Sequence, residues 1–494
     1  MNKKLIPFLC VIIGISTVKA SAAPNEKEAL AAMKKASAFM MDTVSTRGGF
    51  VWNYTSDLSE RWGEVPARDS QIWVQGATNG VGEMFIDAYE ATGDDIFLDY
   101  AERVADAIIR GQHPAGGWHY LIDFDMPGIR RWYDEVATRC WGWEEYYHYY
   151  GNCTFDDNAT ASSTHFLLRL YMTTLDPAYR TPLLKALDFV LEAQFPNGAW
   201  PQRYPLMFDY PHNGHDDYTS YYTFNDGVIP NNLYLLMEAY EKLGDERYYT
   251  AARRAMDFYI ISQGPDDQAG WAQQYSWDMQ PAAARSYEPA AYQPGRTMYS
   301  INDLMTFYKI TGDRRYLAPI LPAIDWIERS AINRDPSKTA SRTGRRIHYT
   351  HARFYEPGTN KPLIVHREGT SIENGRYYAD QNIEDPMCHL GMFGTYDTDA
   401  LRSEYERVSA LTPSGARAEY DAERTTLKPV PEVTPDEVDG LIKSLDDRGA
   451  WITEISIPCY ADPCDQEGRR IFEGIGTREF QRNMTTLINY YRSR

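Results

Sequence analysis

The amino-acid sequence predicts a mainly α fold, an α/α toroid of repeated helical hairpins. A turn with an aspartate followed three residues later by an aromatic residue occurs four times, at Asp94, Asp176, Asp245 and Asp313. An apolar run with helical period stands on each side of every turn, and successive turns are 82, 69 and 68 residues apart. Helical hairpins repeated at such intervals are typical of solenoids and toroids.

The second helix of a hairpin is predicted to end in a glycine-tryptophan phrase. Three such phrases end at Trp118, Trp200 and Trp271, and a weaker one ends at Trp52. Glycine and proline in these phrases end a helix and return the chain to the next hairpin. Two interpretations stay open. The tryptophans, with amides such as Gln202 beside Trp200, line a sugar-binding cleft, or each tryptophan is a hydrophobic plug that closes its repeat.

Two repeats carry an aspartate in the same register, at the entrance of the first helix. Nineteen residues before the four turn aspartates stand Gln75, Asp157, Asp226 and Pro294. Aspartate is a common helix N-cap, and capping alone would explain either residue. The shared register favours a carboxylate cluster of Asp157 and Asp226. Since no histidine or thiolate joins them in the pattern, such a cluster favours a hard cation such as Ca²⁺.

Composition limits the classes of partner. The chain of 494 residues has a formal net charge of −19, which opposes nucleic-acid binding. Its 37 tyrosines and 12 tryptophans favour a carbohydrate surface. Because the repeat spans roughly residues 30–330, we expect one toroidal domain over residues 23–400 and a C-terminal helical extension over 401–494. We expect a monomer.

The first residues have the pattern of a secretory signal peptide. Two lysines precede an apolar stretch, and a small-residue site predicts cleavage after Ala22. No other apolar run approaches membrane-spanning length, so we expect a secreted or periplasmic protein without a membrane span. In an oxidising compartment, disulfides are plausible for Cys140 with Cys153 and for Cys459 with Cys464, which leaves Cys388 buried and free.

Alternating apolar and polar residues predict a short β-hairpin near residues 346–369, with Arg353 and Arg367 on one side. Several long stretches resemble the family 10 polysaccharide lyases, which are calcium-dependent pectate lyases on a small α/α toroid. The resemblance covers about residues 45–370, and its segments are 157–160, 197–205, 222–227, 284–289, 352–362 and 366–369.

The resemblance implies anti β-elimination of a 4-linked α-galacturonan such as polygalacturonate. Asp157 matches the calcium-contacting aspartate, Asp226 a second functional aspartate of the catalytic centre, Arg367 the base, and Arg353 a substrate-binding companion. A free guanidinium stays protonated, so a base needs burial or positive neighbours that lower its pKa. Otherwise Arg367 is a strand-end arginine that pairs with a surface glutamate.

The chain departs from the family after Pro289. Residues 290–296 replace a serine-glycine-acid segment, and no lysine that the family carries near it is evident, so Arg285 or Arg296 takes a substrate-binding role. A longer loop over 209–217 stands beside the expected cleft. Two other functions remain: a glycoside hydrolase with two opposed carboxylates, and a non-catalytic uronan-binding protein.

Overall fold

The computed structural model describes residues 25–137, 151–207, 217–342, 345–368, 376–387, 390–426, 429–457 and 470–494. The predicted signal peptide and most of the predicted loop 209–217 lie outside these ranges. Within the described ranges, every helix is too short or too polar to cross a membrane.

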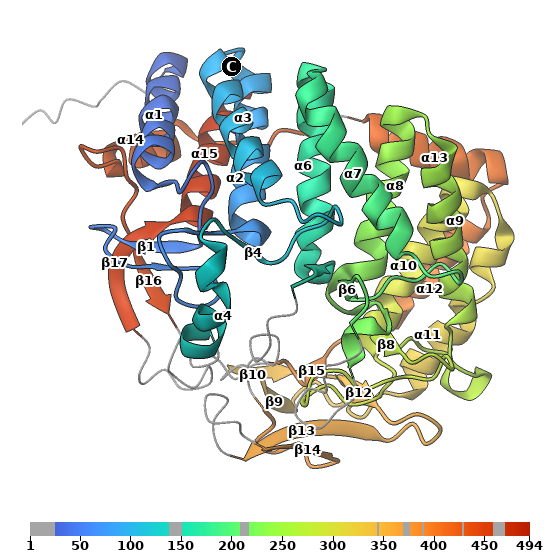
Figure 1. Cartoon of the computed structure of the whole chain (residues 1–494). Coiled ribbons are helices and arrows are strands. Elements are labelled where there is room, and N and C mark those ends of the chain that lie inside the picture. Colours follow the sequence, from blue (N-terminus) through green and yellow to red (C-terminus); the bar gives the residue numbers. More distant parts are fainter. Residues whose placement is uncertain are drawn as a thin grey trace, which may run out of the picture.

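The four predicted hairpins are present (Figure 1). Their helices are α2 (Asn79–Thr92) and α3 (Asp95–Arg110), α6 (Ala159–Thr174) and α7 (Pro177–Ala193), α8 (Val228–Leu243) and α9 (Glu246–Ile261), and α10 (Pro294–Thr311) followed by η10 (Arg314–Leu317) and α11 (Ile320–Arg329). In every turn the aspartate side chain accepts a hydrogen bond from the backbone amide two residues later. The repeated turn motif therefore caps the second helix of each hairpin.

The hairpins form a mainly helical α/α toroid. The first helices of successive hairpins pack against one another, α2 on α6 and α6 on α8. The first and last described helices join the same ring, because α15 (Thr477–Arg492) packs against both α1 (Glu26–Phe39) and α2. The buried core lies between the helix layers and includes Phe85, Phe166 and Phe189.

The remaining C-terminal helices cover the end of the ring. They are α12 (Thr398–Ser409), which packs against α11, α13 (Pro413–Thr425), which packs against α10, and α14 (Pro435–Ser444), which packs against α1. The predicted domain boundary at residue 400 falls inside α12. The helices of the described residues beyond 400 therefore pack on the helices of the toroid.

Three short two-stranded ladders tie the entrance of a hairpin to its exit, at the end away from the aspartate turns (Figure 1). They are β3 (Gln71–Trp73) with β4 (Leu121–Asp123), β5 (Cys153–Thr154) with β6 (Arg203–Tyr204), and β7 (Tyr222–Thr223) with β8 (Gln274–Tyr275). Because equivalent strands end at the same rim, the residues that follow β5 and β7 come close together.

The tryptophans of the glycine-tryptophan phrases are plugs. Trp118, Trp200 and Trp271 are each 0% exposed. Each indole nitrogen donates to a backbone carbonyl of the preceding helix, on Ile108, Val190 and Tyr259, at 2.8, 2.8 and 2.9 Å. The prediction that Trp200 contacts substrate is therefore wrong, since its ring is enclosed by its own repeat and no face is available to a sugar.

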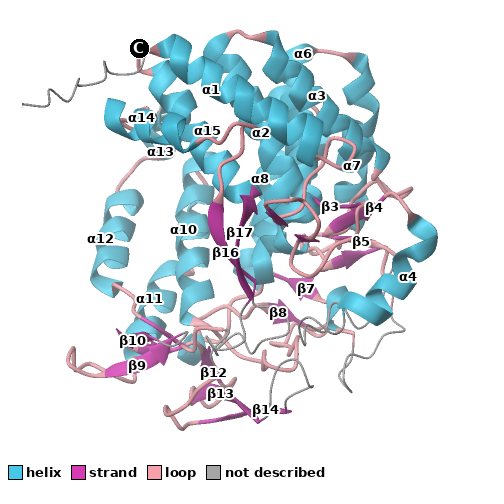
Figure 2. Cartoon of the chain, turned by 90° about the vertical axis from the view of Figure 1, so that its left-hand side faces the viewer, coloured by secondary structure: helices cyan, strands magenta, loops and turns pink. Residues whose placement is uncertain are grey.

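The predicted β-hairpin is present as β12 (Phe354–Tyr355) and β13 (Pro362–Glu368), with β14 (Arg376–Asp380) as a third strand. Figure 2 shows these strands below the helices, on the side of the ladders. Two further ladders pair β9 (Thr339–Arg342) with β10 (Arg345–His348) and β11 (His351–Ala352) with β15 (Phe393–Gly394). A four-stranded sheet has the strand order β16 (Thr453–Ile457), β17 (Arg470–Gly476), β1 (Asn53–Thr55) and β2 (Arg61–Trp62).

Short helical segments connect these elements. They are η1 (Met40–Val44), η2 (Val74–Thr78), η3 (Met126–Gly128), α4 (Ile129–Trp132), η4 (Tyr133–Ala137), η6 (Asp156–Asn158), η7 (Tyr218–Ser220), η8 (Asn225–Gly227) and η9 (Asp266–Gln268).

Cys153, the first residue of β5, is a buried free thiol. Burial raises its pKa to about 12, so it stays protonated at neutral pH. Cys140, its predicted disulfide partner, lies outside the described residues, so this pairing stays a prediction. Cys388, Cys459 and Cys464 also lie outside the described residues, and the second predicted pair stays a prediction.

Candidate active site

Two equivalent turns, η6 and η8, carry the predicted aspartates. Asp157 and Asp226 both have a left-handed backbone with φ of 48°, and each is followed by a second left-handed residue, Asn158 or Gly227. Neither α6 nor α8 begins with a side-chain cap. The N-cap interpretation therefore fails, and the shared register reflects one turn geometry that occurs twice.

A third carboxylate, Asp156, which the repeat register did not indicate, lies close to these two. Asp156 is 2% exposed, and its carboxylate accepts hydrogen bonds from the Tyr120 hydroxyl, from Gln202 Nε2 at 2.8 Å and from Arg285 Nη2 at 3.1 Å. In the equivalent turn the neighbour is Asn225. The adjacent pair of aspartates in the sequence was the available signal.

The three carboxylates form one group. Oxygens of Asp156, Asp157 and Asp226 lie within 4.8 Å of one another, a spacing that suits a metal ion. Loss of hydration and repulsion from Asp156 raise the pKa of Asp226 well above its ordinary value. Burial opposes charge on Asp156, but Arg285 and the hydrogen bonds lower its pKa. A cation here would relieve the repulsion.

Arg285 is in direct contact with the group. Its Nη1 lies 3.4 Å from Asp226 Oδ2 and 3.1 Å from Glu288 Oε2, in addition to its bond to Asp156. Glu288 is 5% exposed and accepts a hydrogen bond from Asn225 Nδ2 at 3.3 Å. The guanidinium therefore joins the two aspartate turns to segment 284–289.

A cavity of about 620 Å³ opens beside Asp226, and Arg296 and Arg353 line it. Burial lowers the pKa of Arg353, and the nearby carboxylates of Glu288 and Asp226 oppose this shift. Arg296 pairs with Asp303 at 3.1 Å and lies 5.1 Å over the Phe224 ring. Two of the predicted substrate-binding arginines thus face the same space as Asp226.

Arg367 is linked to segment 284–289 through a neighbouring strand. It is opposite Tyr377 in the β13–β14 pairing, and the Tyr377 ring lies 5.5 Å from the ring of Tyr287. Tyr287 belongs to the segment that holds Arg285 and Glu288. The strand that carries Arg367 is therefore attached to the same segment as the acidic group.

The structure gives the other predicted contacts different surroundings. Gln202 is fully buried and donates to Asp156, so it positions that carboxylate.

Among the tryptophans of the described residues, the one that presents a large surface is Trp277, which is 46% exposed. The centre of its ring lies 5.4 Å from that of Phe195 and 5.4 Å from that of Tyr222, in the strand β7 that comes before η8. Trp277 follows β8 and stands outside the glycine-tryptophan phrases, so the repeat pattern of the sequence did not point to it.

Comparisons with known proteins give one family. A sequence model described as pectic acid lyase matches residues 135–383, which is just over half of the chain. No curated protein sequence matches the chain.

Among solved structures, a mutant of a family 10 polysaccharide lyase from Cellvibrio cellulosa in complex with trigalaturonic acid is similar, with 18% identity and a TM-score of 0.43 over 67% of this chain and 98% of that one. A D-mannose isomerase has 13% identity and a TM-score of 0.41 over 95% and 98%. A GH76 α-mannanase from Bacteroides thetaiotaomicron has 12% identity and a TM-score of 0.36 over 62% and 72%.

Proposed function

The chain belongs to the pectic acid lyase family, and we propose that it is a secreted pectate lyase that cleaves 4-linked α-galacturonan by calcium-assisted anti β-elimination. The observation that carries the proposal is the carboxylate group of Asp156, Asp157 and Asp226 with Arg285 in contact and Arg353 beside it. Clustered carboxylates suit a cation, and nearby guanidinium groups suit the carboxylates of a uronan.

The residues present fit a calcium ion. Ca²⁺ takes oxygen ligands, and the group offers carboxylate oxygens from two turns with Asp157 exposed and Asp226 partly exposed. Asp157 and Asp226 would hold the ion, with Asp156 behind them. When bound, it supplies Lewis-acid stabilisation of the charge that develops on the uronate carboxylate.

The arginines of the site orient the substrate and supply the base. Arg285, which contacts three carboxylates of the site, orients the uronate carboxylate, together with Arg353 and Arg296. We assign the base to Arg367 on its match to the family's motif. The base takes the C5 proton, the C5–H electrons form the C4–C5 double bond, and the C4–O bond breaks with its electron pair leaving on the glycosidic oxygen, which then takes up a proton.

Ultraviolet absorbance of polygalacturonate digests tests the proposal. We expect absorbance from unsaturated products, its loss in chelator and its return with calcium. Saturated products would indicate a hydrolase, and binding without turnover would indicate a uronan-binding protein. Full activity in chelator would contradict the metal's role.

The assignment of the base is tested separately. Arg367→Ala should lower kcat by roughly 10²–10⁴, the usual contribution of a general base. The matched control is Arg376→Ala, an exposed arginine on the neighbouring strand β14, which should keep wild-type kcat. If Arg353→Ala abolishes turnover while Arg367→Ala does not, the base is Arg353, whose pKa burial already lowers.

Localisation follows from the predicted signal peptide. We propose export and cleavage after Ala22. Amino-terminal sequencing of the exported protein should begin at Ala23, and recovery of an intact amino terminus would contradict this.

A further inference from the structure

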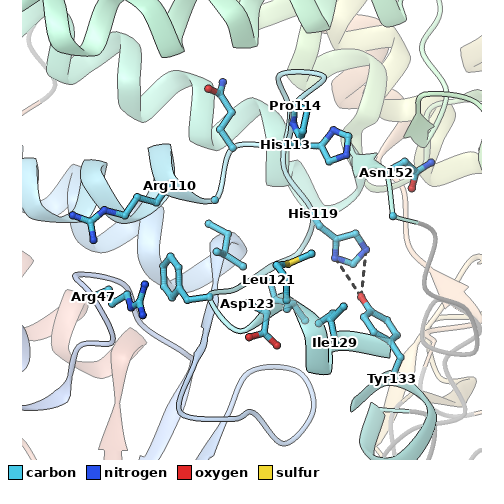
Figure 3. Close-up of a pocket in the computed structure, with 16 residues that line it drawn as sticks. Arg47, Arg110, His113, Pro114, His119, Leu121, Asp123, Ile129, Tyr133 and Asn152 are labelled. Carbon is cyan, nitrogen blue, oxygen red and sulfur yellow. Dashed lines mark hydrogen bonds between the residues drawn. The ribbon is translucent and has the colours of Figure 1, made fainter. Parts of the chain in front are cut away.

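A second cavity, of about 460 Å³, lies beside the first ladder (Figure 3). Its walls come from the turn before β1, the end of α3, β4 and α4. Apart from Gly151 and Asn152, its lining residues precede residue 135 and so lie outside the segment that matches the family. The volume is in the range of small-molecule sites. The cavity therefore lies almost entirely in the part of the chain that precedes the matched segment.

The cavity carries uncompensated positive charge. Within the described part of the chain, neither Arg47 nor Arg110 forms an ion pair; Arg47 stacks over Phe124 at 5.0 Å. The acid in the lining, Asp123, has a buried carboxylate that forms an ion pair with Arg68 and accepts further hydrogen bonds from Ser70 and Gln71. In a protein of net charge −19, two unpaired arginines at one cavity indicate an anionic ligand.

The turn that carries Arg47 is fixed in place. Thr46 and Gly49 exchange backbone hydrogen bonds of 2.9 and 3.0 Å. Gly48 between them has φ of 94°, and a Cβ there would lie 2.3 Å from the carbonyl oxygen of Arg103 on α3. Only glycine allows this close approach, so the turn packs tightly on α3 and holds Arg47 at the cavity.

The opposite side of the cavity offers a hydrogen-bond acceptor (Figure 3). Asn152 is 5% exposed, and its Nδ2 donates to the carbonyl oxygen of Pro205 at 3.0 Å, which fixes the orientation of the amide. Its Oδ1 is buried and has no hydrogen-bond partner among the residues that the structure describes. A buried acceptor without a donor is costly, and a ligand hydroxyl would satisfy it. The ligand thus combines negative charge with hydroxyl groups.

The cavity is connected to the acidic group by a short chain of contacts. His119, in its lining, lies 2.9 Å from Arg203 Nη1, and the Arg203 guanidinium lies 5.2 Å over the Tyr120 ring. The Tyr120 hydroxyl bonds Asp156. The cavity and the carboxylates therefore lie on two sides of one buried layer, at successive ladders of the same rim.

We propose that this cavity is a remote subsite that binds a uronate residue of the polysaccharide chain held at the acidic group, with Arg47 and Arg110 facing its carboxylate and Asn152 Oδ1 accepting from a hydroxyl. The inference rests on the proposed function. It deepens that function, because it makes affinity depend on the length of the uronan beyond the residues at the cleavage point.

Substrate length tests this subsite. The variant is Arg47→Gln with Arg110→Gln, and the control is Arg180→Gln, an exposed arginine at the opposite end of the hairpins. Initial rates with galacturonate trimer and octamer give kcat and KM, and calorimetry with the same oligomers in chelator gives binding without turnover. Exposed charge pairs contribute up to about fivefold each, so the KM of the octamer should rise about tenfold. The trimer's KM, and kcat for both, should stay at wild-type values.

The outcomes separate the subsite from the proposed function. If wild type cleaves both oligomers but the double variant matches it at both lengths, the subsite is refuted and the lyase stands. An equal loss on trimer and octamer also refutes it, because the arginines would then act at the cleavage point. If wild type neither binds nor cleaves any oligomer, the proposed function fails and the subsite with it. Asn152→Ala provides the independent check: it should weaken octamer binding alone.

Discussion

Removal of the Arg285 charge should destabilise the protein strongly. The Arg285 side chain is 10% exposed and pairs with Asp156 and Glu288, whose side chains are 2% and 6% exposed. Arg285→Met keeps a long unbranched side chain but leaves these two carboxylates buried without their cation. Breaking a buried ion pair from one side costs about 3–5 kcal/mol, because the remaining charge has lost both water and its partner.

Calcium should restore part of this loss. A cation bound to the folded state stabilises it by mass action, and the variant group is more negative by one charge than the wild-type group. Added calcium should therefore raise the unfolding free energy of Arg285→Met more than that of wild type. Because both turns and segment 284–289 meet at Arg285, the loss should appear as a shift of the whole unfolding transition.

Urea unfolding with and without chelator measures both effects. The matched control is Arg407→Met, because Arg407 also pairs with two carboxylates, Glu404 and Glu419, but is 47% exposed. An exposed pair of this kind contributes below about 1 kcal/mol. If Arg285→Met loses no more than Arg407→Met, the buried carboxylates do not depend on the guanidinium, and the electrostatic account of the site is refuted.

Two further predictions use residues outside this cluster. Trp200→Ala should lower the unfolding free energy by about 3–5 kcal/mol, because it leaves a cavity in the core. Trp277→Ala should leave the unfolding free energy nearly unchanged and raise KM for pectate, because it removes an exposed stacking surface. Equal losses of unfolding free energy would contradict the assignment of Trp200 as a plug and Trp277 as a platform. Hydrogen bonds that the His165 ring donates to the carboxylates of Glu238 and then Glu83 raise the pKa of His165 to about 10 from 6.5. Its stabilisation is therefore complete below pH 6.5 and is lost as pH rises towards 10. His165→Gln should flatten the pH dependence of unfolding free energy over that window, and an unchanged slope would show that another group titrates there.

The sequence alone predicted the parts of this protein that depend on local periodicity. The four turn aspartates, the helices around them and the shared register of Asp157 and Asp226 follow from spacing, because a helix cap and a repeated turn depend on residues a few positions apart. The β-hairpin over 354–368 could be predicted as well, because alternation of apolar and polar residues is also a local pattern. The family followed from long ordered segments that need no structure to compare.

Only the tertiary structure decided which side chains meet. Asp156 becomes part of the acidic group through Tyr120, Gln202 and Arg285, which come from distant positions in the chain. The same glycine-tryptophan phrase fits a plug or a sugar platform, and burial at 0% selects the plug for Trp200. α15 joins the ring against α2 although about 400 residues separate them. Burial and long-range contacts are set by packing between elements, and local sequence patterns do not encode which elements pack together.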